Sequence, residues 1–253
     1  MSASSILKGA TGFLGAICVW EAARALGFVD PRALPGVGSI LSAMLAGLAD
    51  GELSSALISS LTTWSLGLLL AIVFGAAIGI ALSLFPTLER ITRPLIEFLR
   101  PIPSVAFIPV ALLVLGIGLP MQLFMIVFAS IWPVIFSTKA GVEGVDPRYF
   151  ETGRVFGLPR FERVFRIVLP AALPSIATGA RTASAIALVL TITVEMLVGR
   201  PGIGAYLENV RLNGLVAEMW GAILLTGIVG NIVNSCFLFA ERRLMPWSTD
   251  NRV

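Results

Sequence analysis

The sequence predicts an all-α membrane protein with about six transmembrane helices. Of its 253 residues, 57% are hydrophobic and 13% are charged, whereas about a quarter of a soluble protein's residues are usually charged. The stretches 53–88, 101–138 and 219–240 contain no Asp, Glu, Lys or Arg. Each is long enough for a helix to cross the hydrocarbon core, which takes about 20 apolar residues. The runs are continuously apolar, which excludes the alternating pattern of a membrane β-barrel.

The first transmembrane helix is expected from about Gly9 to Phe28. A cleaved signal peptide is the alternative for this segment, because Lys8 precedes a short apolar run and Ala23-Arg24-Ala25 resembles a cleavage site. The retained helix is favoured, because further spans follow it and no soluble mature domain does.

Five further spans follow from the apolar runs. The segment from Asp30 to Glu52 is rich in Pro and Gly, and is expected outside the membrane with a surface helix from Ser39 to Leu48. The spans are about Leu57 to Leu84, Ser104 to Leu115, Met121 to Ser137, Ala172 to Val198 and Met219 to Ala240. The chain then divides into an N-terminal helix with its outer segment (1–52), a core transmembrane domain (53–247) and a short cytoplasmic tail (248–253).

The sequence predicts close helix packing for the second span and an irregular start for the third. Gly75 and Gly79 have the four-residue spacing of small residues that lets helix backbones approach closely in membranes. A basic turn is expected between the two spans. The third span is expected to begin irregularly because three prolines lie at its start. These residues are Arg90, Arg93 and Arg100 in the turn and Pro101, Pro103 and Pro109 at the entry to the third span.

The distribution of Lys and Arg predicts the orientation. With the N-terminus in the cytoplasm, thirteen of these residues fall in inner loops and termini, four fall in outer loops, and Arg181 lies within a span. Such an excess is typical of cytoplasmic loops. Both termini and the loop 146–170 are therefore expected in the cytoplasm.

The loop 146–170 carries a short helix with a start and a stop signal. Asp146-Pro147 predicts an N-cap followed by Pro at the first helical position. Gly157, with Leu158-Pro159 after it, predicts the end of the helix. Aromatic residues rimmed by arginine then suggest an anchor for a cytoplasmic partner. The alternative is a helix on the membrane surface, with its aromatic residues in the headgroups.

The register of this loop matches a known motif, the EAA loop, which reads Glu-Ala-Ala, three residues, Gly, nine residues and Ile-x-Leu-Pro. Glu151, Gly157, Ile167, Leu169 and Pro170 occupy its positions. The chain resembles the membrane subunits of type I ABC importers, in particular the taurine, sulfonate and nitrate group. The resemblance covers nearly everything from Leu34 onward.

Two positions depart from the motif. Thr152 and Gly153 stand where the motif has two alanines. Both residues are small, so close packing of the helix is expected to survive. Gly153 should soften the helix by about 1 kcal/mol relative to Ala.

The resemblance implies that this loop is a coupling helix seated in a groove of a separate ATPase subunit. Glu151 and Arg154 would make charge-assisted contacts there or fix the loop. The expected coupling residues are Tyr149, Phe150, Glu151, Thr152, Gly153, Arg154, Phe156, Gly157, Ile167, Leu169 and Pro170.

The resemblance also implies the partners and the cargo. They are a second permease subunit in a homodimer, two ABC ATPase subunits and an extracytoplasmic solute-binding protein in a bacterial cytoplasmic membrane. The solute is expected to be small and anionic, such as a sulfonate, taurine, nitrate or an aromatic carboxylate. The sequence has no Gly-x-x-x-x-Gly-Lys-Ser/Thr loop, so ATP and Mg²⁺ are expected on the ATPase subunit. No cofactor, metal or nucleic acid is expected on this chain, which is not predicted to be an enzyme.

Three polar residues within spans are candidates for the translocation path or a gate. Glu195 either serves such a role or lies one turn from the outer interface and reaches water. Arg181 either meets an anionic solute or extends to the headgroups. Asn231 either lines the path or forms a hydrogen bond between helices.

The turn Pro201-Gly202-Ile203-Gly204 is the candidate docking site for the solute-binding protein, because it matches a family feature outside the membrane. The alternative is a simple tight turn, which Pro-Gly forms unaided.

Two other classes of protein fit the sequence less well. A secondary transporter or channel commonly uses several intramembrane carboxylates or repeated broken helices, and Glu195 is the one candidate carboxylate. An intramembrane enzyme is disfavoured, because the sequence has no histidine, Gly-x-Ser-x-Gly elbow or metal cluster.

Overall fold

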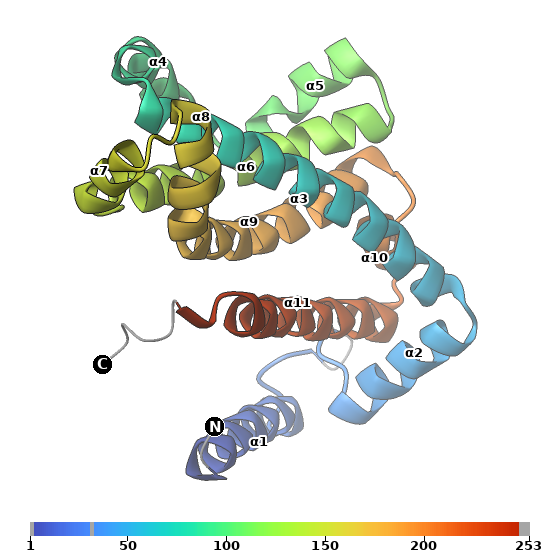
Figure 1. Ribbon diagram of the computed structural model, residues 1–253. Helices are drawn as coiled ribbons and strands as arrows, with labels where there is room; N and C mark the ends of the chain where they lie inside the picture. Colours follow the sequence, from blue (N-terminus) through green and yellow to red (C-terminus); the bar gives the residue numbers. More distant parts are fainter. Residues whose placement is uncertain (1–2, 31–32, 248–253) are drawn as a thin grey trace.

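The computed structural model describes residues 3–30 and 33–247, and every regular element in those ranges is a helix (Figure 1). The elements are α1 (Ala3–Ala25), α2 (Val37–Ala49), α3 (Glu52–Leu84), α4 (Pro86–Leu99), η1 (Ser104–Phe107), α5 (Ile108–Leu115), α6 (Leu119–Glu143), α7 (Pro147–Val155), α8 (Arg160–Arg163), the π-helix η2 (Val164–Val168), α9 (Leu169–Val198), α10 (Ile203–Leu212) and α11 (Val216–Leu244).

The long helices α3, α6 and α9 pack at the centre through glycine. A Cβ on Gly75 of α3 would lie 2.8 Å from the Cβ of Val134, and one on Gly79 would lie 2.7 Å from the Cβ of Thr138. Gly179 of α9 makes the same kind of approach to Ser137 of α6, at 2.8 Å. Small residues at such contacts let helix backbones come close. The close packing expected at Gly75 and Gly79 is confirmed.

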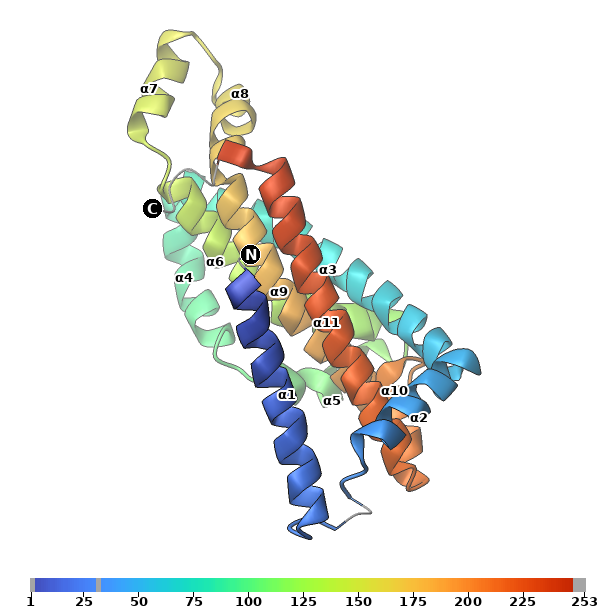
Figure 2. The ribbon, with the colours of Figure 1, turned by 90° about the horizontal axis from the view of Figure 1, so that it is seen from below.

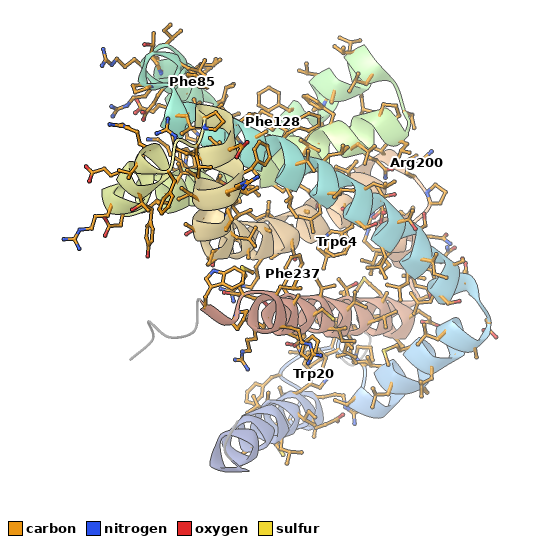
Figure 3. The ribbon with its side chains drawn as sticks, viewed as in Figure 1. Trp20, Trp64, Phe85, Phe128, Arg200 and Phe237 are labelled. Carbon is orange, nitrogen blue, oxygen red and sulfur yellow. The ribbon has the colours of Figure 1, made fainter. Side chains whose placement is uncertain are left out.

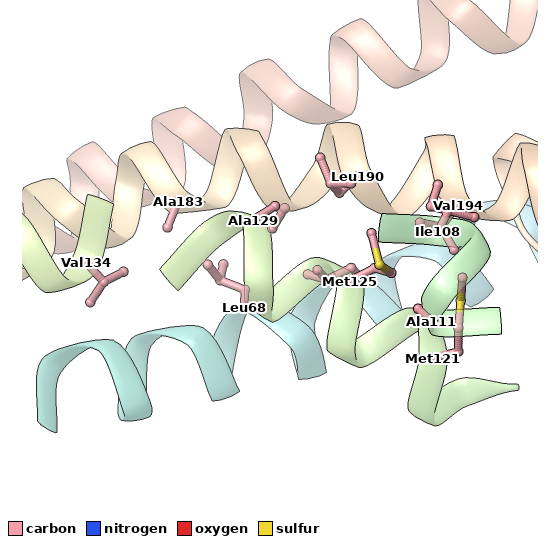
Figure 4. Close-up of a cluster of buried hydrophobic side chains, with 12 residues drawn as sticks. Leu68, Ile108, Ala111, Met121, Met125, Ala129, Val134, Ala183, Leu190 and Val194 are labelled. Atoms are coloured by element: carbon pink, nitrogen blue, oxygen red, sulfur yellow. The ribbon is translucent and has the colours of Figure 1, made fainter. Parts of the chain in front are cut away.

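The main apolar core lies between α3, α5, α6 and α9 (Figure 4). Its buried side chains are Leu68, Ile108, Ala111, Met121, Met125, Ile126, Ala129, Val134, Ala183, Ala187, Leu190 and Val194. A second cluster joins α2 and the start of α3 to α10 and α11, with Met44, Leu53, Ala222 and Leu225 at its centre. Helix α10 therefore packs between the central bundle and α11.

Four helical segments in the described residues are long and apolar enough to cross a membrane: α3, α6, η2 with α9, and α11. Helix α4 with η1 and α5 would be a fifth, but the pair is bent by 90°. The expected span from Ser104 to Leu115 is the second member of this bent pair, made of η1 and α5, and its start is the 3-10 turn η1. Pro101 and Pro103 lie in the break, where they lack the N–H that would continue a helix. Helix α1 covers most of the expected first span but is not among the four.

The basic turn expected after α3 is a helix of 14 residues, α4, with Pro86 in its first turn. Its apolar residues Leu88, Ile91, Leu95 and Phe98 recur every three or four positions and are all exposed. This spacing is typical of an amphipathic helix. Figure 3 shows Phe85 where α4 begins.

At the opposite end of the molecule, one helix was predicted and another was missed. Helix α2 confirms the helix expected from Ser39 to Leu48, and it lies against α11, where a Cβ on Gly221 would come 3.2 Å from the Cα of Met44. Helix α10 was expected only as a turn at Pro201–Gly204. Helix α1 meets α11 through Trp20, whose ring lies edge-on to Trp220 at 4.8 Å.

Candidate functional site

Helix α7 projects from one end of the molecule, and both of its ends are capped (Figure 2). The Asp146 side chain accepts a hydrogen bond of 2.9 Å from the Arg148 N–H, as expected of an N-cap. At the other end, Gly157 has a φ of +69° and donates to the Arg154 carbonyl, while the Leu158 N–H donates to the Gly153 carbonyl. These are the two bonds of a Schellman motif. The predicted helix and both of its end signals are confirmed.

A glycine holds α7 against the chain that follows it. Gly153 is buried, and a Cβ there would lie 2.7 Å from Cδ1 of Ile167 and 3.2 Å from Cγ of Arg163. The backbone of α7 therefore rests on the side chain of Ile167 in η2. The alanine of the motif would require the end of that side chain to move.

Three aromatic or aliphatic side chains near the two ends of α7 are exposed. Tyr149, Val155 and Phe156 are 59%, 86% and 78% exposed, and we call these three residues the α7 surface. Phe150 was also expected to contribute, but its side chain is not among those that the structure describes. Val155 was not predicted to contribute, although its place beside Phe156 at the end of the helix could have indicated it. Exposed apolar groups of this size on a rigid helix are suited to contact with another protein.

Two charged residues of α7 face the bundle. Glu151 and Arg154 line a pocket beneath the helix, beside Ser83 at the end of α3 and Glu143 at the end of α6. The Thr152 hydroxyl donates to the Arg148 carbonyl of its own helix, at 2.9 Å. Glu151 and Arg154 therefore line the gap between α7 and the bundle.

The rest of the motif forms the start of α9. Ile167 lies in the π-helix η2, where the Leu169 N–H donates to the Val164 carbonyl five residues earlier. Pro170 has no N–H and follows directly after this π-helical turn. Helix α9 therefore begins in an irregular turn next to α7.

Arg181 forms an ion pair with a second helix. Its Nη1 lies 3.7 Å from Oε2 of Glu241 near the end of α11, and both side chains are largely buried. The sequence separation of sixty residues left this ion pair unpredicted. Asn231 is exposed on α11.

Glu195 is fully buried, so the expectation that it reaches water is wrong. Its Oε2 accepts hydrogen bonds from the Ser60 hydroxyl at 2.7 Å and from the Gly204 N–H at 3.1 Å. Of the expected docking turn, Gly202, Ile203 and Gly204 are buried and Pro201 is exposed. Figure 3 shows Arg200 at this connection between α9 and α10. Within the described ranges, no three His, Cys, Asp or Glu side chains come together to hold a metal ion.

Comparison with protein families finds one match over most of the chain. The family described as "Binding-protein-dependent transport system inner membrane component" matches residues 67–249, which include α7, the whole of α9 and α10.

Individual relatives cover a similar extent. The nitrate import permease protein NrtB of Synechocystis sp. is 32% identical over 200 residues, covering 79% of this chain and 73% of its own. The taurine transport system permease protein TauC of Escherichia coli is 29% identical, covering 91% and 86%. The putative aliphatic sulfonates transport permease protein SsuC of Bacillus subtilis is 28% identical, covering 91% and 84%.

Solved structures share the fold. An inward-facing structure of the MetNI methionine ABC transporter superposes with a TM-score of 0.67 at 18% identity, over 79% of this chain and 98% of that one. An amino acid ABC transporter crystallised with histidines gives a TM-score of 0.62 at 15% identity, over 80% and 97%. The all-α architecture predicted from the sequence is confirmed.

Proposed function

This chain belongs to the family of binding-protein-dependent transport system inner membrane components, and we propose that it forms the membrane path for a small anionic solute. It is the permease subunit of an ABC importer, and it works with an ATPase and a solute-binding protein. The relatives named above transport nitrate, taurine and aliphatic sulfonates, which all carry a negatively charged oxygen-rich group. That shared chemistry supports an anionic solute for this chain.

The contact with the ATPase is assigned to the α7 surface. A helix capped at both ends resists bending when a partner pushes on it, and its exposed aromatic side chains suit a groove. Glu151 and Arg154 are assigned to holding α7 on the bundle, because both line the pocket beneath it. This role is one of the two expected for them from the sequence. The capped and exposed helix is the single observation that carries the proposal.

The orientation and the assembly complete the proposal. The α7 end of the molecule faces the cytoplasm, together with both chain termini, because the arginine-rich loops lie there. The end that carries α2 and α10 faces the solute-binding protein (Figure 2). Two copies of the chain enclose the path, each with one ATPase subunit, which binds the ATP and Mg²⁺.

The test is ATP hydrolysis by the complex, assembled with its ATPase and solute-binding protein in lipid nanodiscs. The solute-binding protein is loaded in turn with taurine, nitrate, methanesulfonate or bicarbonate. In Phe156→Ala, we expect the stimulation by loaded binding protein to fall at least tenfold, the effect of losing about 1.4 kcal/mol at an interface anchor. The matched control is Phe239→Ala, because Phe239 is 69% exposed on α11 and lies neither on α7 nor at the end that carries α2 and α10.

Two outcomes would contradict the proposal. One is that no ATPase co-purifies with the chain, which would favour a channel or secondary transporter. The other is that Phe156→Ala hydrolyses ATP like the wild type, which would make α7 a membrane-surface helix.

A further inference from the structure

The N-terminus of α10 is held by polar side chains from two other helices. The Ile203 N–H donates to the Ser60 hydroxyl oxygen at 2.8 Å, and that hydroxyl donates to Glu195 Oε2 at 2.7 Å. The Gly204 N–H donates to the same carboxylate oxygen at 3.1 Å. The first N–H groups of a helix have no partner within it, and a carboxylate stabilises them. Here that carboxylate comes from α9, and the bridging hydroxyl comes from α3.

The contact leaves no room for a side chain in the turn. A Cβ on Gly202 would lie 2.2 Å from Cδ of Glu195, and one on Gly204 would lie 2.1 Å from the Ile192 carbonyl oxygen. The Ser59 hydroxyl adds a hydrogen bond to the Pro201 carbonyl at 2.8 Å. The start of α10 therefore lies directly on α9 and α3.

Helix α9 leads from this contact to α7. With η2 it forms one helical segment of 35 residues, Val164–Val198, which spans roughly 50 Å at 1.5 Å per residue. Glu195 lies near one end, and Ile167, on which Gly153 of α7 rests, lies near the other. Figure 2 shows α7 and α10 at opposite ends of the molecule.

We propose that Glu195 is a positioning residue that makes α10 and α9 move together, so that events at α10 and at α7 are coupled through α9. This inference rests on the proposed function, since it assigns a route between the two docking surfaces. A gate or solute contact is the role it replaces: Oε2 is occupied by two donors, and the side chain is fully buried. Coupling between two sites is reciprocal, so it can be measured from the ATPase side without knowing the solute.

The experiment measures hydrogen exchange in the complex with its ATPase in nanodiscs, with and without ATP plus vanadate. In the wild type, we expect nucleotide to change exchange in both 147–158 and 200–212. In Glu195→Leu, the response of 147–158 should remain and that of 200–212 should fall on the order of tenfold, the size of a typical coupling. Ser60→Ala, which keeps the Gly204 bond, should give a smaller loss and serves if Glu195→Leu does not assemble.

Two further variants distinguish a positioning role of Glu195 from a role of its charge. Glu195 Oε1 has no hydrogen-bond partner among the described residues, so Glu195→Gln can keep both bonds with its carbonyl oxygen and should behave as the wild type. Thr193→Val removes a hydroxyl that bonds only within α9, to Val189, and should also be normal. A full response of 200–212 in assembled Glu195→Leu or Ser60→Ala overturns the inference. So does a loss in Glu195→Gln with Ser60→Ala normal, because that pattern indicates a role for the charge.

The wild-type complex tells the two hypotheses apart. If 147–158 responds to nucleotide and 200–212 does not, this inference fails and the proposed contact of α7 with the ATPase stands. If neither segment responds, the proposed function fails and the inference fails with it.

Discussion

The two ends of α9 are built in contrasting ways. At the α10 end, hydrogen bonds from α3 and α10 meet on one buried carboxylate of α9, and Gly204 fits against backbone atoms of α9. At the α7 end, a capped helix rests on the side chains of Ile167 and Arg163, and its α7 surface is exposed to solvent. The first end tolerates little change, whereas the second leaves its contact surface free for a partner. A rigid contact at the α10 end and an exposed surface at the α7 end suit a helix, α9, that transmits motion from one end to the other.

The largest effect is expected from Gly204→Ala at the α10 end. Its Cβ would lie 2.1 Å from the Ile192 carbonyl oxygen and 2.7 Å from the Met196 nitrogen, and these backbone atoms of α9 cannot move aside. We expect a loss of about 3 kcal/mol in the free energy of unfolding, measured by thermal unfolding in nanodiscs. The control is Gly227→Ala in α11, where nothing lies within 4 Å. Equal melting temperatures for Gly204→Ala and Gly227→Ala would show that the α10 end is not tightly packed.

A smaller effect is expected from Gly157→Ala at the α7 end. Its φ of +69° is strained for alanine, although the space around it is empty, so the cost is about 1 kcal/mol. We expect faster hydrogen exchange in 147–158 with an unchanged melting temperature, because α7 is held to the bundle by few contacts. Gly38→Ala, which also lies in open space but without a positive φ, should leave exchange unchanged. A lowered melting temperature would mean that α7 is integral to the bundle.

Gly153→Ala should change stability least among the glycine variants. Helix propensity favours alanine by about 1 kcal/mol, while the contact with Cδ1 of Ile167 at 2.7 Å opposes it. We expect the gain in helix propensity and the cost of the contact to offset each other. The free energy of opening of α7, measured by hydrogen exchange in 147–158, should then change by less than about 1 kcal/mol. In the background Ile167→Val, which lacks that carbon, the alanine should stabilise α7. A double-mutant cycle measures the coupling between Gly153→Ala and Ile167→Val. Purely additive effects would contradict a contact between these two positions.

The smallest effect concerns the surface of α10. The pKa of the Glu208 carboxyl is lowered, chiefly by its hydrogen bond with Arg211 at 2.8 Å and less by the charge of that residue. The stabilisation is present above the unfolded pKa of Glu208 and is lost as pH falls through its lowered folded pKa. Thermal unfolding of Arg211→Ala should therefore lack a slight acid-dependent step that the wild type shows. A large difference near neutral pH would contradict this reading.

The sequence predicted best where local signals decide the structure. The cap at Asp146 and the stop at Gly157 act within a few residues, and α7 formed between them as expected. The spans built on long apolar runs were also found, although α6 and α11 extend beyond their predicted ends at both sides. Those extensions include Lys139 and Arg242, which apolarity alone would exclude.

Prediction from the sequence failed where local signals conflict and where residues distant in the sequence determine the structure. The amphipathic spacing in α4 was readable, but its arginines and the prolines after it favoured a turn. Helix α10 was missed because Pro201-Gly202 satisfies a turn by itself, while the groups that start the helix, Ser60 and Glu195, are remote in sequence. The pairing of Arg181 with Glu241 depends on how α11 packs, which no local pattern shows.

The glycine contacts between α3 and α6 restrict how the protein can move. Gly67, Gly75 and Gly79 meet Ile126, Val134 and Thr138, each pair separated by 59 residues. This constant register fixes the two helices as one rigid body, since sliding either would bring larger residues into the narrow seam. A transport cycle must then take its hinge motion from elements outside the seam, such as the bent pair of α4 and α5. Spin labels on α3 and α6 should keep one separation throughout the cycle, and labels on α4 should not.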